Sequence, residues 1–206
     1  MRTLWLQWGG NKELLNQFGL PKLDYPLCYN IPRTAWTESN STLQLSNQDE
    51  YQLFIDMLLE VDKTISPSNN NLSIDDIIRS YRMCLGVAQP FSTDTVDSPT
   101  IRDEVVGIYY SRFSDQSNKI SPPINSKKID TIINRTEIRC NHNSLNIEIE
   151  NFIGIQTITF LSQFTTLHPG DFISLGTLIF VNEFHKSSAK FEIKFEDWHQ
   201  EFTITD

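Results

Sequence analysis

The sequence has few cysteines and lacks the motifs that cysteines usually form. Cys28, Cys84 and Cys140 are the only three among 206 residues, and no Cys-x-x-Cys pair occurs. The spacing excludes a zinc ribbon and a thioredoxin-like redox motif. The simplest interpretation is three free thiols buried in a protein of a reducing compartment.

Long hydrophobic runs are lacking as well. No stretch approaches the ~18 consecutive apolar residues that a membrane span needs, and the N-terminal residues include no apolar stretch of signal-peptide length. We therefore expect a cytoplasmic protein with no membrane partner.

Positive charge is scarce, because 17 Lys and Arg face 26 Asp and Glu for a net charge of −9. This balance argues against a nucleic-acid partner, which would require clustered basic residues. Phosphate-binding loops are absent too, since Gly9-Gly10 starts neither a GxGxxG nor a GxxxxGK motif. No histidine is placed with a Ser or Cys nucleophile in a recognisable triad arrangement. These absences exclude several function classes without selecting one.

The hydrophobic content of 39% and the length are typical of one globular domain, here residues 1–206. Residues 51–61 form an apolar run whose Leu and Met content favours a helix, although periodicity alone also permits a buried strand. Ser73 is a good N-cap, and the apolar spacing that follows predicts a helix over 73–85. Residues 154–164 are a second candidate helix.

The second half of the chain is rich in strand patterns. Strands are predicted in 104–113, 128–143, 144–152, 171–181, 189–195 and 201–206. Asn141-His142-Asn143 is placed to turn a hairpin between Thr136 and Glu150. Successive strands with few helices predict a β-rich α+β fold with a mixed or antiparallel sheet.

The stretch FLSQFTTLHPGDFISLGTL, Phe160 to Leu178, resembles the fumarylacetoacetate hydrolase superfamily. There a short helix, a Leu-x-Pro-Gly-Asp turn, an apolar strand and a Gly-Thr-Pro follow in this order; here Leu178 replaces the proline. TEIRCNHNSLNIEI has the place of a hairpin in that family, and DYPLCYNIPRTAW loosely matches a proline-framed strand. The resemblance covers residues 24–206 and leaves 1–23 as a strand and helix lead-in.

This resemblance implies a compact β-roll with flanking helices that assembles as a homodimer. It also makes residues 51–59 a strand, which replaces the helix that propensity alone favours. The implied chemistry is hydrolysis, hydration or decarboxylation of a small 2-oxo or β-diketo acid beside Mg²⁺ or Mn²⁺, a small carboxylate-containing molecule being the partner.

The family's metal site is a Glu-x-Glu on an apolar strand plus an Asp about thirty residues further on. Two carboxylates at i and i+2 share one face of a strand and can hold one ion. The matching strand offers Gln52, or Glu50 with Gln52 in a shifted register, and Asp94 is the candidate for the third ligand. We expect no intact metal site, so Glu50, Gln52 and Asp94 are remnants that would bind Mg²⁺ or Mn²⁺ poorly.

The substrate side is better preserved. Thr177, with Gly176 before it, matches the threonine that binds the substrate carboxylate in the family. Arg112, or alternatively Lys119, has roughly the place of the basic residue that steadies the anion. Catalytic residues are not identified. Three interpretations stay open: a divergent hydrolase or lyase, a non-catalytic binding or assembly subunit, and a metal-independent lyase or cyclase of a specialised pathway.

Overall fold

The computed structural model describes residues 2–8, 27–38, 43–44, 50–67, 74–88, 116–124, 129–145, 154–185 and 189–205. They form a seven-stranded sheet in the order β2-β1-β10-β5-β6-β7-β3 and a five-stranded sheet in the order β4-β12-β11-β8-β9. The larger sheet consists of β1 (Leu4–Trp8), β2 (Leu27–Ile31), β3 (Trp36–Thr37), β5 (Glu50–Val61), β6 (Ile78–Ala88), β7 (Asn118–Ile120) and β10 (Phe172–His185). The smaller sheet consists of β4 (Leu43–Gln44), β8 (Thr136–Cys140), β9 (Asn143–Leu145), β11 (Ala189–Phe195) and β12 (Trp198–Thr205).

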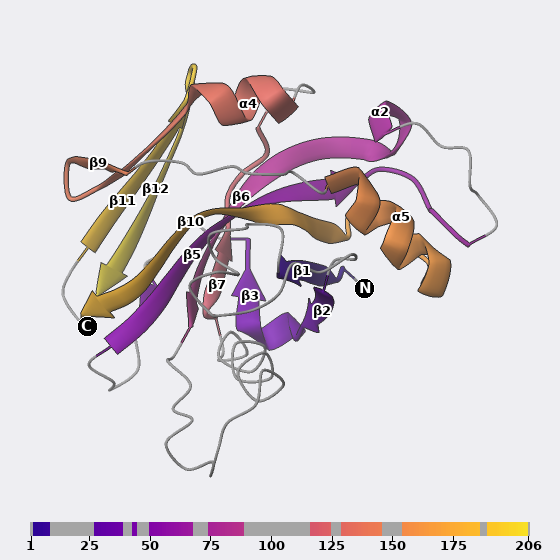
Figure 1. Cartoon of the computed structure of the whole chain (residues 1–206), viewed down its shortest axis with the longest axis horizontal. Coiled ribbons are helices and arrows are strands. Elements are labelled where there is room, and N and C mark those ends of the chain that lie inside the picture. The colour runs from indigo at the N-terminus through magenta and orange to yellow at the C-terminus, as the bar shows by residue number, and fades with distance from the viewer. Residues whose placement is uncertain are drawn as a thin grey trace, which may run out of the picture.

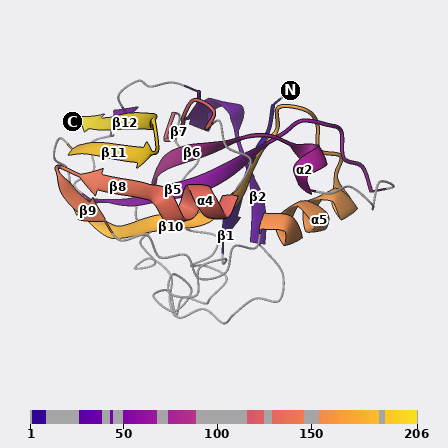
Figure 2. The same cartoon turned by 90° about the horizontal axis from the view of Figure 1, so that it is seen from above.

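The helices are short. They are the 3₁₀ turn η1 (Arg33–Ala35), α2 (Ile74–Ile77), α4 (Ile129–Arg135) and α5 (Gly154–Phe164). The long strands β5, β6 and β10 run side by side through the molecule, as Figure 1 shows. Figure 2 shows the smaller sheet towards one end of these strands and α5 towards the other. Among the described residues, no helix is long and apolar enough to cross a bilayer.

Both sheets mix the two strand directions. The pairs β1–β10, β3–β7 and β4–β12 are parallel, whereas β10–β5, β5–β6 and β11–β12 are antiparallel. The prediction of a β-rich α+β fold with a mixed sheet and few helices is therefore confirmed.

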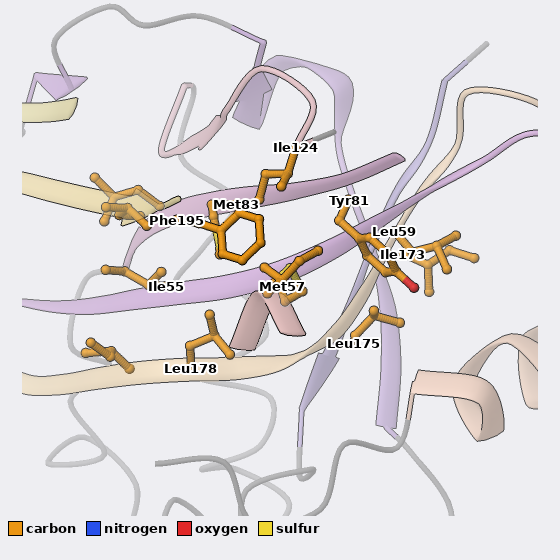
Figure 3. Packing of buried hydrophobic residues seen from close by; sticks show 14 of the residues in the cluster. Ile55, Met57, Leu59, Tyr81, Met83, Ile124, Ile173, Leu175, Leu178 and Phe195 are labelled. Atoms are coloured by element: carbon orange, nitrogen blue, oxygen red, sulfur yellow. The ribbon is translucent and has the colours of Figure 1, made fainter. Parts of the chain in front are cut away.

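The main core lies on one face of the larger sheet. Successive side chains of a strand point to opposite faces, so the odd-numbered residues of β5 share one side. Leu53, Ile55, Met57, Leu59 and Val61 are all fully buried there. Figure 3 shows residues of this set packed against Met83 of β6, Leu178 of β10 and Phe195 of the smaller sheet. Each such side chain contributes about 2 kcal/mol by burial, which fixes the register of the sheet.

The other face of the larger sheet is buried as well, because the sheet curls on itself. Trp36 of β3 lies edge-on to Phe172 of β10, with ring centroids 5.5 Å apart. Three strands separate β3 from β10 in the sheet order, so this contact requires the sheet to roll. The even-numbered residues of β5 therefore face the inside of the roll, and Phe54, Asp56 and Glu60 among them are at most 1% exposed.

A buried ion cluster stabilises the inside of the roll. Glu60 accepts hydrogen bonds from Arg82 Nε at 2.9 Å and Nη2 at 2.7 Å, and from Ser80 Oγ at 2.8 Å. Arg82 also donates to the carbonyl of Ser121 at 3.1 Å and lies 5.2 Å from the centroid of the Phe172 ring. Burial raises the pKa of Glu60, but the hydrogen bonds and charges of its partners outweigh burial and lower that pKa overall. Glu60 is thus an ionised buried acceptor.

Two predicted elements were wrong in part. The helix expected over 73–85 is only the single turn α2, and β6 takes the remainder. In the sheet, β6 lies between β5 and β7, and its residues 81–88 are buried on both faces. A strand buried on both faces shows no alternation of apolar and polar residues, so the helical spacing was coincidental. The strand pattern in 128–143 begins as α4, because Ile132 packs into the core from a helix.

The hairpin prediction is confirmed as far as residue 145. Asn141 and His142 join β8 to β9 with φ of 47° and 74°. Positive φ at both central residues is the conformation that tight hairpin turns need, and Asn adopts it readily. The strand over 51–59 and the helix over 154–164 are also present, as β5 and α5. The strand predicted over 104–113 lies outside the described residues.

Replacing Glu60 with Gln should lower the free energy of unfolding at pH 7 by about 3 kcal/mol, since Arg82 loses its buried counter-charge. The folded-state pKa of Glu60 is lowered, so its stabilisation is present above the ordinary value of 4.5 and is lost as the pH falls below it. Denaturant unfolding of the wild-type protein and the variant, at pH 7 and again below pH 4.5, measures the effect.

Glu196→Gln is the matched control, because Glu196 pairs with Arg135 at 2.7 Å while both side chains are more than half exposed. This variant should change stability little. Equal losses in the two variants would contradict a structural role for the buried cluster.

Candidate functional site

The Pro-Gly-Asp turn that precedes β10 has a structural role. Asp171 is 3% exposed, and its carboxylate accepts hydrogen bonds from the backbone N–H groups of Thr3 and His168, both at 2.8 Å. Gly170 has φ of 86° and donates its N–H to the carbonyl of Val61 at 2.8 Å. The turn thus holds β1 and the end of β5 against β10. Both carboxylate oxygens of Asp171 already accept hydrogen bonds from the backbone.

The distinctive backbone of β10 lies a few residues further on, at Gly176. The register of β10 against β5 shifts between Ser174 and Gly176 and again between Thr177 and Ile179. Gly176 has φ of 137°, a conformation that side chains rarely adopt, and its N–H donates to Ser174 Oγ at 3.2 Å. A Cβ added to Gly176 would meet no atom within 4 Å. The double irregularity therefore leaves open space beside Gly176.

Thr177 follows Gly176 along β10 and is half-buried. Its Oγ1 donates a hydrogen bond of 2.6 Å to Oδ1 of Asp56, the residue opposite it on β5. Asp56 is 1% exposed, and its neighbour on the other side is Cys84 of β6. Thr177, Asp56 and Cys84 thus form a row across three strands on the inside of the roll, and this row is the candidate site.

Asp56 was missed by the sequence analysis, although a signal for it exists. It is the one charged residue within the apolar run from Leu53 to Leu59. A charge in the middle of a buried strand has to be satisfied by a partner or a ligand. The partner, Thr177, is 121 residues away along the chain, so only the register of the sheet could reveal the pair.

Two of the remnant metal ligands, Gln52 and Glu50, lie away from Thr177 in the register of the sheet. Gln52 pairs with Ala88 of β6, and Glu50 pairs with His185 near the far end of β10. At a strand rise of about 3.3 Å per residue, Gln52 is about 13 Å and Glu50 about 20 Å from Asp56 along β5. Asp94 and Arg112 lie outside the described residues.

The described positions near Asp56 on the inside of the roll lack carboxylates. The residue two positions before Asp56 on the same face is Phe54, and the cross-strand partner of Phe54 is Gly86. A phenyl ring and a glycine supply no side-chain oxygen. The described donors here therefore do not fit Mg²⁺ or Mn²⁺, which need several oxygen ligands.

In the part of the chain that the structure describes, no group of three or more His, Cys, Asp and Glu residues is arranged to hold a metal ion.

Lys119, the alternative to Arg112, is buried on β7 with 1% exposed, and burial lowers the pKa of its ammonium group. It lies opposite Leu85 in the register, and Leu85 belongs to the main core. Strand alternation therefore places Lys119 on the face of the sheet opposite to Asp56.

Solved structures share this architecture over the whole chain. A fumarylacetoacetate hydrolase family protein from Yersinia pestis CO92 superposes with a TM-score of 0.73 at 15% identity, covering 99% of this chain and 93% of the other. A fumarylacetoacetate isomerase/hydrolase from Oleispira antarctica superposes with a TM-score of 0.75 at 12% identity, with the same coverage. The chain has the fumarylacetoacetate hydrolase fold. The resemblance first seen around the Pro-Gly-Asp turn is confirmed at the level of the fold.

A third structure with the fumarylacetoacetate hydrolase fold is fumarylpyruvate hydrolase from Pseudomonas aeruginosa, solved with Mn²⁺ and pyruvate. It superposes with a TM-score of 0.70 at 14% identity, covering 100% of this chain and 90% of the other. No family model and no curated protein matches the sequence. At these identities the comparison establishes the fold, and the chemistry has to be argued from this chain's own residues.

Millimolar Mg²⁺ or Mn²⁺ should leave the melting temperature of the wild-type protein unchanged, because a ligand stabilises only a protein that binds it. Differential scanning fluorimetry after chelation and re-addition of each ion measures this. The double variant Phe54→Glu with Gly86→Asp is the positive control, since it adds two carboxylates beside Asp56. A metal-dependent rise in the wild-type protein would contradict the donor-set argument.

Proposed function

We propose that this protein binds, or acts on, a small 2-oxo or β-diketo acid at Gly176 and Thr177 without a conventional divalent metal centre. The observation that carries the proposal is the open space beside Gly176, which precedes in the chain a threonine that is hydrogen-bonded to the buried Asp56. Ligand sites are concave places where a few polar groups converge. The shared fold with a fumarylpyruvate hydrolase solved with pyruvate supports the class of ligand.

The acid end of the ligand needs a cation. Arg112 is our proposal for this role, as the resemblance implies, because a guanidinium fork matches a carboxylate in shape and charge. Lys119 is less suitable, since the register places it on the other face of the sheet.

A second function is binding without turnover, as a partner subunit or a small-molecule binder. It is favoured by Phe54 and Gly86, which lie near Asp56 on the inside of the roll and supply no side-chain oxygen to a metal ion. A Lewis-acid metal is what polarises the oxo acid in the family's chemistry, so if no such ion binds, the chain has to use other groups or none. If the protein turns over the oxo acid, we expect a metal-independent lyase or cyclase.

A homodimer is also part of the proposal, on the resemblance alone. Sedimentation velocity tests it directly, since a sedimenting mass near twice 23.8 kDa supports the dimer and a single-chain mass contradicts it.

Binding is best tested by calorimetry with chelator-treated protein and 2,4-dioxopentanoate, oxaloacetate or pyruvate. Thr177→Val should weaken binding about tenfold, the worth of one hydrogen bond, and Arg112→Ala should weaken it at least as much. Thr203→Val, in β12 of the smaller sheet, is the matched control and should bind as the wild-type protein does.

The same samples separate the two functions. Loss of substrate over time in the wild-type protein, abolished in Thr177→Val, supports the enzyme. Binding without loss of substrate supports the non-catalytic subunit. If none of the three acids binds, the proposed function is wrong.

A further inference from the structure

β3 lies at an edge of the larger sheet and is held there by few backbone contacts. In the described sheet order its one neighbour is β7, and the pairing covers only Trp36 and Thr37. The turn η1 before it adds a hydrogen bond of 2.8 Å from the N–H of Gln116 to the carbonyl of Thr34. A pairing this short stabilises a strand little by itself. The position of β3 therefore depends on what its side chains contact.

Two side chains of this segment reach across the roll. Trp36 packs edge-on against Phe172 of β10, and Glu38 follows β3 and pairs with two guanidinium groups. Glu38 Oε1 accepts a hydrogen bond from Nη1 of Arg2, and its Oε2 lies 3.4 Å from Nη1 of Arg82. Arg2 lies just before β1, which four strands separate from β3 in the sheet order. Glu38 therefore ties the edge of the sheet to its far side.

The groups that receive Glu38 have other partners as well. Arg82 donates two hydrogen bonds to Glu60. The guanidinium groups of Arg82 and Arg2 lie 5.2 Å and 5.7 Å from the centroid of the Phe172 ring. Arg82 would thus stay paired if Glu38 moved away, and no buried charge would be left uncompensated.

The ion pair at the edge differs from the buried pair in its access to water. The side chains of Arg2 and Glu38 are 40% and 30% exposed. Those of Arg82 and Glu60 are only 11% and 2% exposed. Exposed ion pairs are weak and are screened by dissolved salt, whereas buried pairs are screened much less. Salt should therefore weaken the contacts of Glu38 and leave the pair of Arg82 and Glu60 in place.

Trp36 both opposes and favours a separation of β3 from β10. Its side chain is 1% exposed, and burial of so large a ring opposes the separation. Its Nε1 is buried too, and in the part of the chain that the structure describes no group accepts its hydrogen. A buried donor without a partner costs free energy, which is recovered when water reaches it. Separation is therefore a minor state that becomes more populated when the ion pairs of Glu38 are weakened.

We infer that residues 33–38 form a salt-sensitive latch, which Glu38 holds closed over the inside of the roll. The latch opens locally, while the main core stays folded. Opening moves β3 away from β10 and uncovers the inside of the roll, where Asp56 and Cys84 lie. The latch thus regulates how often the candidate site meets solvent. It does not depend on the identity of any ligand, and so it goes beyond the proposed function.

Cys84 reports the opening, because its thiol is fully buried on the inside of the roll. The wild-type protein is treated with N-ethylmaleimide, which is uncharged, and the labelling of each cysteine is followed by peptide mass spectrometry. Raising NaCl from about 10 mM to about 1 M shortens the screening length from about 30 Å to about 3 Å. This should speed the labelling of Cys84 about fivefold, the factor that corresponds to one weak ion pair. Cys140, in the smaller sheet, is the internal control and should change little.

Variants assign the effect to Glu38. Glu38→Gln should speed the labelling of Cys84 about fivefold at low salt and remove most of the salt dependence. Glu196→Gln is the matched control, since Glu196 forms an exposed ion pair with Arg135 elsewhere in the molecule, and it should label as the wild-type protein does. Denaturant unfolding of each protein gives the labelling rate that global unfolding alone would allow. The labelling of Cys84 should exceed that rate at both salt concentrations.

Three outcomes would overturn the inference. Labelling of Cys84 that never exceeds the rate set by global unfolding shows that the latch does not open locally. Equal labelling rates in the wild-type protein and in Glu38→Gln show that Glu38 does not hold the latch. A salt effect that Glu38→Gln retains in full shows that other charges carry it. None of these outcomes bears on the binding of an oxo acid, which calorimetry tests separately.

Discussion

The pairing of β10 with β5 is the constraint on which the remainder of this structure depends. Its register places Thr177 opposite Asp56 and, on the other face, brings apolar residues of both strands into the main core. A slip of one residue would turn the apolar set into the roll and the polar set into the core. The burial that fixes the fold therefore also fixes the candidate site. The two irregularities around Gly176 lie between paired stretches of β10, Phe172 to Ser174 before them and Ile179 to Val181 after them.

The inner face of β5 uses two buried carboxylates in different ways. Glu60 is matched by the guanidinium of Arg82 and by further cations, as a structural ion pair must be if it is to offset the cost of burying its charge. Asp56 instead accepts a hydrogen bond from the hydroxyl of Thr177, the residue after Gly176. The first arrangement holds the rolled sheet together. The second orients a threonine that follows Gly176, where the β10 backbone leaves open space.

Much of the fold was predictable because local signals agreed with it. The strict alternation of β11 and the turn residues of the β8–β9 hairpin each specify their structure over a few positions. The Pro-Gly-Asp turn with Gly176 and Thr177 carried the resemblance to the whole fold. The helix expected over 73–85 failed because a strand buried on both faces carries no alternation. Asp56 could not be assigned from local sequence, since its role is created by a strand more than a hundred residues away. The lack of metal-binding side chains near Asp56 became visible only once the register showed that Phe54 and Gly86 lie near it.

The central claim is that a small oxo acid binds beside Gly176 and Thr177 without a metal ion. The most direct measurement is a titration of isotope-labelled, chelator-treated protein with 2,4-dioxopentanoate, followed through the backbone amide resonances. The account predicts saturable shifts at Gly176, Thr177 and Asp56, and none at Lys190 or Thr203 in the smaller sheet. Shifts confined to other residues, or no saturable shift at any concentration at which the ligand stays soluble, would contradict it.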